Sequence, residues 1–328
     1  MTESTVERQV DDRLKPAGGR RRRSAVAPAT GPAERKRAHR LANRDRSWAI
    51  LLLAPNLLLY VVFIIIPIVL AFLLSFTSWN LVGPPQFVGF ANYVQVWHDP
   101  MVPQAMETTF VFLLFGTVPT VVLGLALAVL LNANFRFIGL IRTLYFVPAV
   151  VSFAASAVLW QWIYRPGQGI VDYLLQQVGV AGPAWLSDSH TALPALDIVG
   201  IWMALPVAIL LYLAALQRIP ASVIEAAMLD GAGPLARLRH VIWPGVRNIT
   251  IIVVIVSTLA FTNGSFDLVK ILTQGGPINA TTTLIYYIYY VAFDNIQIGY
   301  AAALSALQVA MFAVLLGLLA VARKVTTR

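Results

Sequence analysis

Six long windows without a charged residue dominate this sequence, and each is about as long as a helix that crosses a membrane. A lone strand would leave its backbone groups unpaired in lipid, so we expect helices. Only 12% of the residues are charged, against about 25% in soluble domains. The sequence therefore predicts an all-α, polytopic membrane protein with six spans, at residues 47–77, 108–131, 143–164, 198–217, 248–266 and 295–322.

The distribution of positive charge predicts the orientation of these spans. With the N-terminus inside, 22 of the 24 Lys and Arg fall in cytoplasmic segments, and only Arg165 and Lys270 lie outside. Because Lys and Arg concentrate in cytoplasmic segments, we expect both termini in the cytoplasm. Residues 1–46 hold 13 of these positive charges without an apolar period, which predicts a disordered basic tail. The transmembrane domain then covers 47–323, and 324–328 form a C-terminal tail.

One further apolar stretch, "LIYYIYYVAF" at 284–293, is too short to be a seventh span. The breaker sequence "QGGPINATTT" precedes it, and four of its ten residues are Tyr. Tyrosine is typical of the membrane interface. We therefore predict an interfacial or re-entrant segment.

The polar segment 218–247 lies between the fourth and fifth windows and contains "EAAMLDGAGPLARLRHVIWP". Pro220 suits the first turn of a helix, and Ser222 and Glu225 have the spacing of a capping box. Gly231 can end this helix, because glycine accepts positive φ angles. The sequence then predicts a second short helix from Pro234 to Pro244. Such a loop could be a surface connector, a DNA-binding helix-turn-helix or a docking element for a cytoplasmic partner.

The sequence shows no catalytic, metal or cofactor site. It contains no Cys, and its four His are scattered without metal-ligand spacing. None of the four Lys follows a glycine, so the phosphate-binding G-x-x-x-x-G-K-[ST] loop is missing. We therefore expect no enzyme activity and no cofactor in this chain, and any energy source must lie on another subunit.

A band of small polar residues at the end of the fifth window is the candidate substrate path. Polar groups within spans usually face the protein interior, although helix–helix packing is the plainer explanation here. Small polar groups beside aromatic rings select Thr262, Asn263, Ser265 and Phe266, with Trp202 in the fourth window as a similar candidate.

The loop also resembles the cytoplasmic signature of ABC importer permeases. The matching residues are Glu225-Ala226-Ala227, then Gly231, then "VIWP" ending at Pro244. The family usually ends this motif Ile-x-Leu-Pro, so Val241 and Trp243 depart from it. The stretches "RTLYFVPAVVSFAASAVLWQWIYRPGQGIVDYLL" and "SFDLVKILTQGGPINATTTLIYYIYYVAF" are similar to the carbohydrate branch, the permeases of the maltose and glycerol-phosphate type. The likeness covers roughly residues 49–321.

This resemblance implies a fold, a set of partners and a role. The fold is the six-helix core of a type I importer permease in the cell membrane. The partners are a second permease, two ATP-binding subunits and an extracellular solute-binding protein that delivers a sugar. The resemblance assigns ATPase coupling to Glu225, Ala226, Ala227, Gly231 and Pro244. A permease for a non-sugar nutrient and an ion-driven transporter remain the alternatives; the latter should carry charges inside its spans, and the six windows contain none.

Overall fold

The computed structural model describes residues 52–132 and 138–326, so the predicted tail 1–46 lies outside the described residues. The chain divides into two compact units, 1–66 and 67–328. The described part of the first unit is helical and mainly apolar, with a π-helical turn η1 at Val61–Ile65. It continues as α3 (Ile66–Leu74) into the second unit, and together they form the first candidate span, Leu52–Leu74.

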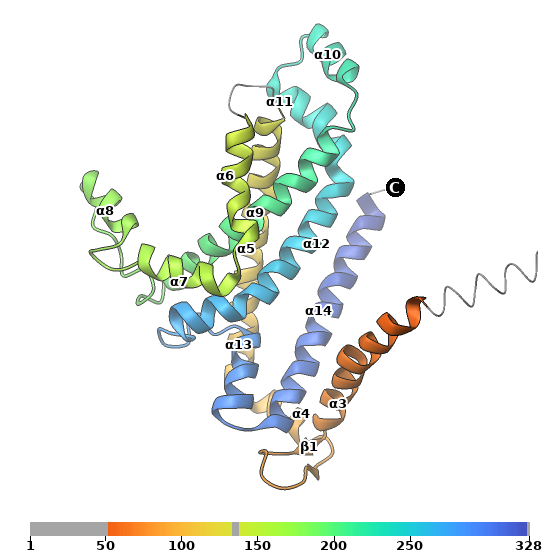
Figure 1. Cartoon of the computed structure of the whole chain (residues 1–328), viewed down its shortest axis with the longest axis vertical. Coiled ribbons are helices and arrows are strands. Elements are labelled where there is room, and N and C mark those ends of the chain that lie inside the picture. Colours follow the sequence, from red (N-terminus) through yellow and green to blue (C-terminus); the bar gives the residue numbers. More distant parts are fainter. Residues whose placement is uncertain (1–51, 133–137, 327–328) are drawn as a thin grey trace, which may run out of the picture. The chain divides into compact units, whose positions relative to one another are not determined.

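Within residues 52–132 and 138–326, five helices are long and apolar enough to cross a membrane, and a bent pair makes a sixth span if it counts as one. In the second unit these are α5 (Met101–Leu131), α9 (Ala192–Leu216), α12 (Trp243–Leu268) and α14 (Ile298–Thr326). The bent pair is α6 (Ile138–Val150) and α7 (Phe153–Ile163). The all-α, polytopic prediction is confirmed. Within the second unit, α5, α9 and α12 pack side by side (Figure 1).

The third predicted span is not one straight helix, because α6 and α7 meet at 107°. Pro148 interrupts the hydrogen bonding near the end of α6. Ser152 then starts a new helix, and its hydroxyl accepts a hydrogen bond from the Ala155 N–H at 3.3 Å. An apolar window cannot reveal such a break, since both halves are equally apolar.

Phe261 fills the crossing of the three central helices. Its ring is 2% exposed and meets Phe112 of α5 edge-on, with the centroids 5.4 Å apart. Gly116 on α5 and Gly200 on α9 face the same ring, and a Cβ at either position would overlap it. Small residues of this kind let helix backbones approach closely in membranes. The sequence thus fixes α5 and α9 around one aromatic side chain of α12.

The shorter elements at the end of the bundle opposite the 218–247 loop surround the start of α5 (Figure 1). The predicted interfacial segment is α13 (Leu284–Tyr289) with the π-helical turn η4 (Tyr290–Asp294), and it is not a span. Tyr287 and Tyr300 both donate hydrogen bonds of 2.5 Å to Asp99 Oδ2. A short hairpin that the sequence did not suggest, β1 (Thr77–Ser78) with β2 (Gln86–Phe87), and the helix α4 (Ala91–His98) complete this end.

Candidate functional site

The 218–247 loop contains a short first helix, α10 (Ala221–Leu229), as predicted. Its start differs from the prediction. Pro220 is the N-cap with extended backbone, rather than the first helical residue, and no side chain caps this helix. The capping box of Ser222 and Glu225 does not form, because a helix beginning at Ala221 already includes Ser222 in its first turn.

Gly231 ends α10 in a Schellman motif. Its φ is +78°, its own N–H bonds Met228 O at 3.0 Å, and the Ala232 N–H bonds Ala227 O at 2.9 Å. These two bonds satisfy carbonyl groups that the end of a helix leaves free. A Cβ on Gly231 would have no heavy atom within 4 Å. The turn is therefore set by backbone conformation alone, and the space around it is open.

The second helix starts at Pro234, as predicted, but Pro244 does not end it. A helical run continues from Pro234 to Thr273 through α11 (Pro234–Arg237), the π-helical turn η2 (Leu238–Ile242), α12 and a second such turn, η3 (Val269–Thr273). The Trp243 N–H bonds Leu238 O, five residues back. This wider turn just before Pro244 accommodates a ring that would crowd a regular α-helix.

The loop presents its motif outward. Glu225, Ala226, Gly231 and Pro244 are exposed, and Ala227 is half-buried. Two large apolar side chains stand beside them, Leu229 at 90% exposed and Leu235 at 77% exposed. Outside a span, exposed apolar side chains of this kind are typical of protein contact sites. The structure thus places four of the five predicted coupling residues, Glu225 to Gly231, in α10 and the turn that ends it, whereas Pro244 lies at the start of α12.

The five substrate-path candidates do not form one set of free polar groups. The Thr262 hydroxyl bonds Thr258 O at 2.8 Å, and the Ser265 hydroxyl bonds Thr262 O at 2.8 Å, both within their own helix. Asn263 is exposed on the surface of this single chain. Trp202 packs against Trp160 of α7, with ring centroids 5.8 Å apart.

Phe266 belongs to an aromatic ladder that the sequence analysis did not identify. Its ring lies 5.0 Å from that of Tyr289, which in turn lies 5.1 Å from Phe293. The Lys270 ammonium stands 4.4 Å from the centroid of the Tyr289 ring. Regular spacing of Phe266 and Lys270 along one helix was visible in the sequence, but their meeting with Tyr289 depends on how η3 turns back into α13.

A cavity of about 190 Å³ lies between α6, α7, α9 and α12. Apolar side chains such as Met203, Val207 and Val253 line it, with the Ser257 hydroxyl among them. Ser257, in the middle of the fifth window, is the one polar lining residue that the sequence could have indicated.

Asp197 is a second feature that the sequence analysis missed. The predicted fourth span started at residue 198, whereas α9 starts at Ala192 and includes this carboxyl group. Asp197 is 5% exposed, and its Oδ1 has no hydrogen-bond partner. The fourth span therefore does contain an acidic residue, and the absence of charge no longer argues against an ion-driven transporter.

Comparison with known proteins settles the class. Residues 101–326 match the family described as "Binding-protein-dependent transport system inner membrane component". The chain is 33% identical over 271 residues to the probable ABC transporter permease protein YurN of Bacillus subtilis, covering 81% of this chain and 92% of that protein. It is 34% identical over 265 residues to the sn-glycerol-3-phosphate transport system permease protein UgpA of Escherichia coli, covering 80% and 89%.

Solved structures give the same fold. A bacterial ABC transporter that imports the acidic polysaccharide alginate contains a chain that superposes with a TM-score of 0.75 at 19% identity, covering 89% of this chain and all of that one. The alginate transporter in complex with its alginate pentasaccharide-bound periplasmic protein gives a TM-score of 0.73 at 18% identity, covering 85% and 94%.

These matches define a membrane permease of the ABC importer class. The chain belongs to the family of inner membrane components of binding-protein-dependent transport systems, with the type I importer permease fold. Family membership, rather than the charge of the spans, argues against the ion-driven alternative.

Proposed function

We propose that this chain, together with a second permease, forms the membrane path of an importer for a sugar or sugar derivative. Separate ATP-binding subunits drive the transport, and an extracellular binding protein supplies the substrate. Relatives of the glycerol-phosphate permease type support the substrate class. Of the alternatives, a permease for a different nutrient is the one that remains.

The observation that carries this proposal is the geometry of the 218–247 loop. It joins the two central helices α9 and α12, and it projects beyond their ends (Figure 1). The open turn at Gly231 and the exposed Leu229 and Leu235 offer a small, rigid, partly apolar surface. An ATP-binding subunit that grips this surface would move the start of the helix from Pro234 to Thr273 directly.

ATP is needed because substrate contacts alone supply too little free energy. Moving a two-state path from about 1:99 to 99:1 takes roughly 5.5 kcal/mol of differential free energy. A sugar held by a few hydroxyl contacts would have to bind one state about 10⁴-fold more tightly. Coupling through the loop supplies this difference from outside the membrane.

The test is Gly231→Val in the full complex, purified through this permease. A branched residue at a φ of +78° costs about 1 kcal/mol or more and puts bulk into the open space. We expect normal membrane insertion, with less ATP-binding subunit retained and weaker substrate-stimulated ATP hydrolysis. The matched control is Gly233→Ala in the same turn, where φ is −66° and no atom lies near a Cβ.

A connector role predicts a different result. If the loop only joins two spans, Gly231→Val lowers stability slightly and leaves both subunit retention and hydrolysis at wild-type levels. That outcome would remove the docking role and, with it, the main structural support for the proposed function.

A further inference from the structure

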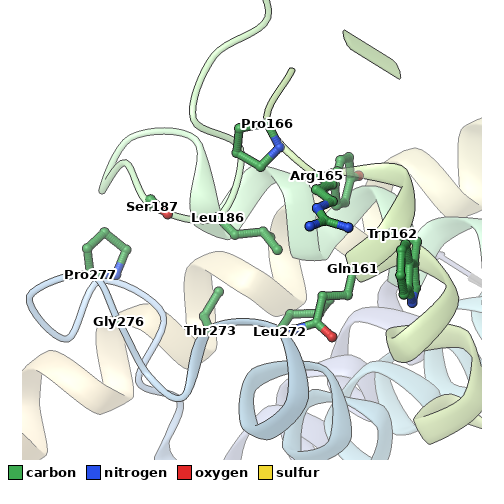
Figure 2. Close-up of a pocket in the computed structure, with 11 residues that line it drawn as sticks. Gln161, Trp162, Arg165, Pro166, Leu186, Ser187, Leu272, Thr273, Gly276 and Pro277 are labelled. Atoms are coloured by element: carbon green, nitrogen blue, oxygen red, sulfur yellow. The ribbon is translucent and has the colours of Figure 1, made fainter. Parts of the chain in front are cut away.

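A cavity of about 650 Å³ opens at the end of α7. Three separate segments line it: the end of α7 with the residues after it, the segment before α9, and η3 with the turn that follows (Figure 2). The charge distribution predicts that Arg165 and the residues after it, the segment before α9, and η3 with its turn lie outside the cell. Gln161, Trp162 and Tyr164 are among the last residues of the predicted third span. The volume of the cavity is within the range of small-molecule sites, about 300–1,000 Å³.

The walls of this cavity are held by buried hydrogen bonds. Tyr164 is 2% exposed, and its hydroxyl donates to Ala195 O at 3.1 Å. Its ring stacks on Trp185, whose indole N–H donates to Asp172 Oδ1 at 2.7 Å. The other oxygen of Asp172 accepts the Gly167 N–H at 2.7 Å. The residues that follow α7 are therefore fixed against the segment before α9.

The opposite wall is equally well held. The hydroxyls of Thr273 and Thr281 lie 2.7 Å apart, and Thr281 also donates to Gly276 O at 2.7 Å. These bonds shape the turn after η3 on the far side of the cavity. A site whose two walls are fixed before a ligand arrives loses less conformational entropy on binding.

The chemistry of the lining favours an anion attached to a ring. The Arg165 guanidinium carbon lies 5.3 Å from the centroid of the Trp162 ring, so this cation stands against an aromatic face. Figure 2 shows Gln161 and Arg165 reaching into the same space, with Ser187 across from them. A guanidinium matches carboxylate and phosphate oxygens with two parallel hydrogen bonds.

We propose that this cavity is an outer subsite for the anionic end of a saccharide. The carboxylate or phosphate binds Arg165, the apolar face of the sugar ring lies against Trp162, and Gln161 and Ser187 bind hydroxyl groups. This inference rests on the proposed function. The cavity lies at the opposite end of α9 and α12 from the ATPase-coupling loop (Figure 1). The inference adds the substrate class: a uronate or a sugar phosphate rather than a neutral sugar.

The test uses Leu186→Cys as a reporter, because Leu186 lines the cavity without a proposed contact to the ligand and the wild-type chain has no Cys. The full importer complex is placed in phosphatidylcholine nanodiscs, and maleimide labelling of this chain is read by mass spectrometry. Three probes compete with labelling: trigalacturonate, glucose 6-phosphate and neutral maltotriose. We expect at least one anionic probe to protect the thiol at a concentration at least tenfold lower than maltotriose does.

Variants identify the group responsible. Arg165→Gln should raise the protecting concentration of the anionic probe about tenfold or more, since a bond to a charged group is lost, and should leave maltotriose unchanged. Arg218→Gln is the matched control, an exposed arginine in the 218–247 loop. Equal protection by charged and neutral probes, or protection that does not change with Arg165→Gln, would overturn the subsite.

Two further arms separate this inference from its alternatives. Nanodiscs containing phosphatidylglycerol test a lipid headgroup; full protection of the thiol by this lipid alone, lost in Arg165→Gln, would assign the cavity to lipid and refute the saccharide. ATP hydrolysis stimulated by the loaded binding protein is measured in the same discs. If ATP hydrolysis is normal but charged and neutral probes protect the thiol equally, only the subsite proposal is refuted. If the wild-type chain retains no ATP-binding subunit, the proposed function is refuted.

Discussion

The packing around Phe261 makes a quantitative prediction about the central helices. A methyl group added at Gly116 of α5 or at Gly200 of α9 would overlap the Phe261 ring. The ring is 2% exposed and also packs against Phe112, so it has little room to move. Gly116→Ala and Gly200→Ala should therefore each destabilise the protein, although alanine is a better helix former than glycine.

The expected cost follows from overpacking. Extra methyl groups in a well-packed core cost about 1–3 kcal/mol, against a gain of about 1 kcal/mol from helix propensity. A smaller side chain at position 261 should relieve the overlap. The double variant Gly116→Ala with Phe261→Leu should therefore be more stable than the sum of the two single-variant costs predicts. We expect a coupling of about 1 kcal/mol or more, within the range for residues in contact.

The assay is unfolding of the purified full-length permease in mixed micelles with increasing dodecyl sulfate, followed by circular dichroism. Gly139→Ala is the control, because this glycine lies in α6 and no atom is near its Cβ. The control should unfold at the wild-type midpoint or above it. Strict additivity of Gly116→Ala and Phe261→Leu, or an equal loss in the control, would refute the steric argument.

Three further predictions concern the membrane orientation, the hydrogen bonds to Asp99 and the substrate-path candidate Asn263. In sealed cells, Gln86→Cys should react with an impermeant maleimide while Gly233→Cys does not, and external labelling of Gly233→Cys would reverse the predicted orientation. Burial alone would raise the pKa of Asp99, but hydrogen bonds, including the one from Tyr287, outweigh it and hold the pKa below 3.8. The stability that the ionised carboxylate contributes above 3.8 should therefore be lost as the pH falls through the lowered pKa. Asp99→Asn should abolish this pH dependence in a thermal melt. Asn263→Leu should lower substrate uptake while the complex still assembles, and unchanged uptake kinetics would remove Asn263 from the path.

Features governed by local rules could be predicted from the sequence. The apolar windows located the spans, and the glycine pattern placed the helix end at Gly231, where the positive φ and both Schellman bonds are found. Pro234 was recognised as a helix start for the same reason, since a residue without an N–H fits the first turn. Each of these features depends on residues within one turn of the chain.

Features governed by tertiary contacts could not be predicted in this way. Pro244 was expected to end a helix, but a π-helical turn just before it lets the helix continue, and no local pattern indicates that turn. Asp197 was missed because the span was drawn to begin after the charge, whereas α9 buries it. The cavity at the end of α7 combines residues about 110 positions apart, such as Arg165 and Thr273, and no local pattern brings them together.

The continuous helix from Pro234 to Thr273 connects the two ends of the proposed mechanism. Its 40 residues span about 60 Å at 1.5 Å per residue. The coupling turn at Gly231 lies just before its first residue, and Thr273 at its end lines the outer cavity. A packed helix moves as a rigid element, whereas its two π-helical turns, η2 and η3, are points where regular hydrogen bonding is already interrupted. A displacement of the loop by an ATP-binding subunit would therefore tilt the helix between these turns, past Phe261, and change the wall of the cavity that holds Thr273. Under the proposed function, the cavity and the loop would be coupled through this one helix, and substrate bound at one end should alter ATP hydrolysis at the other.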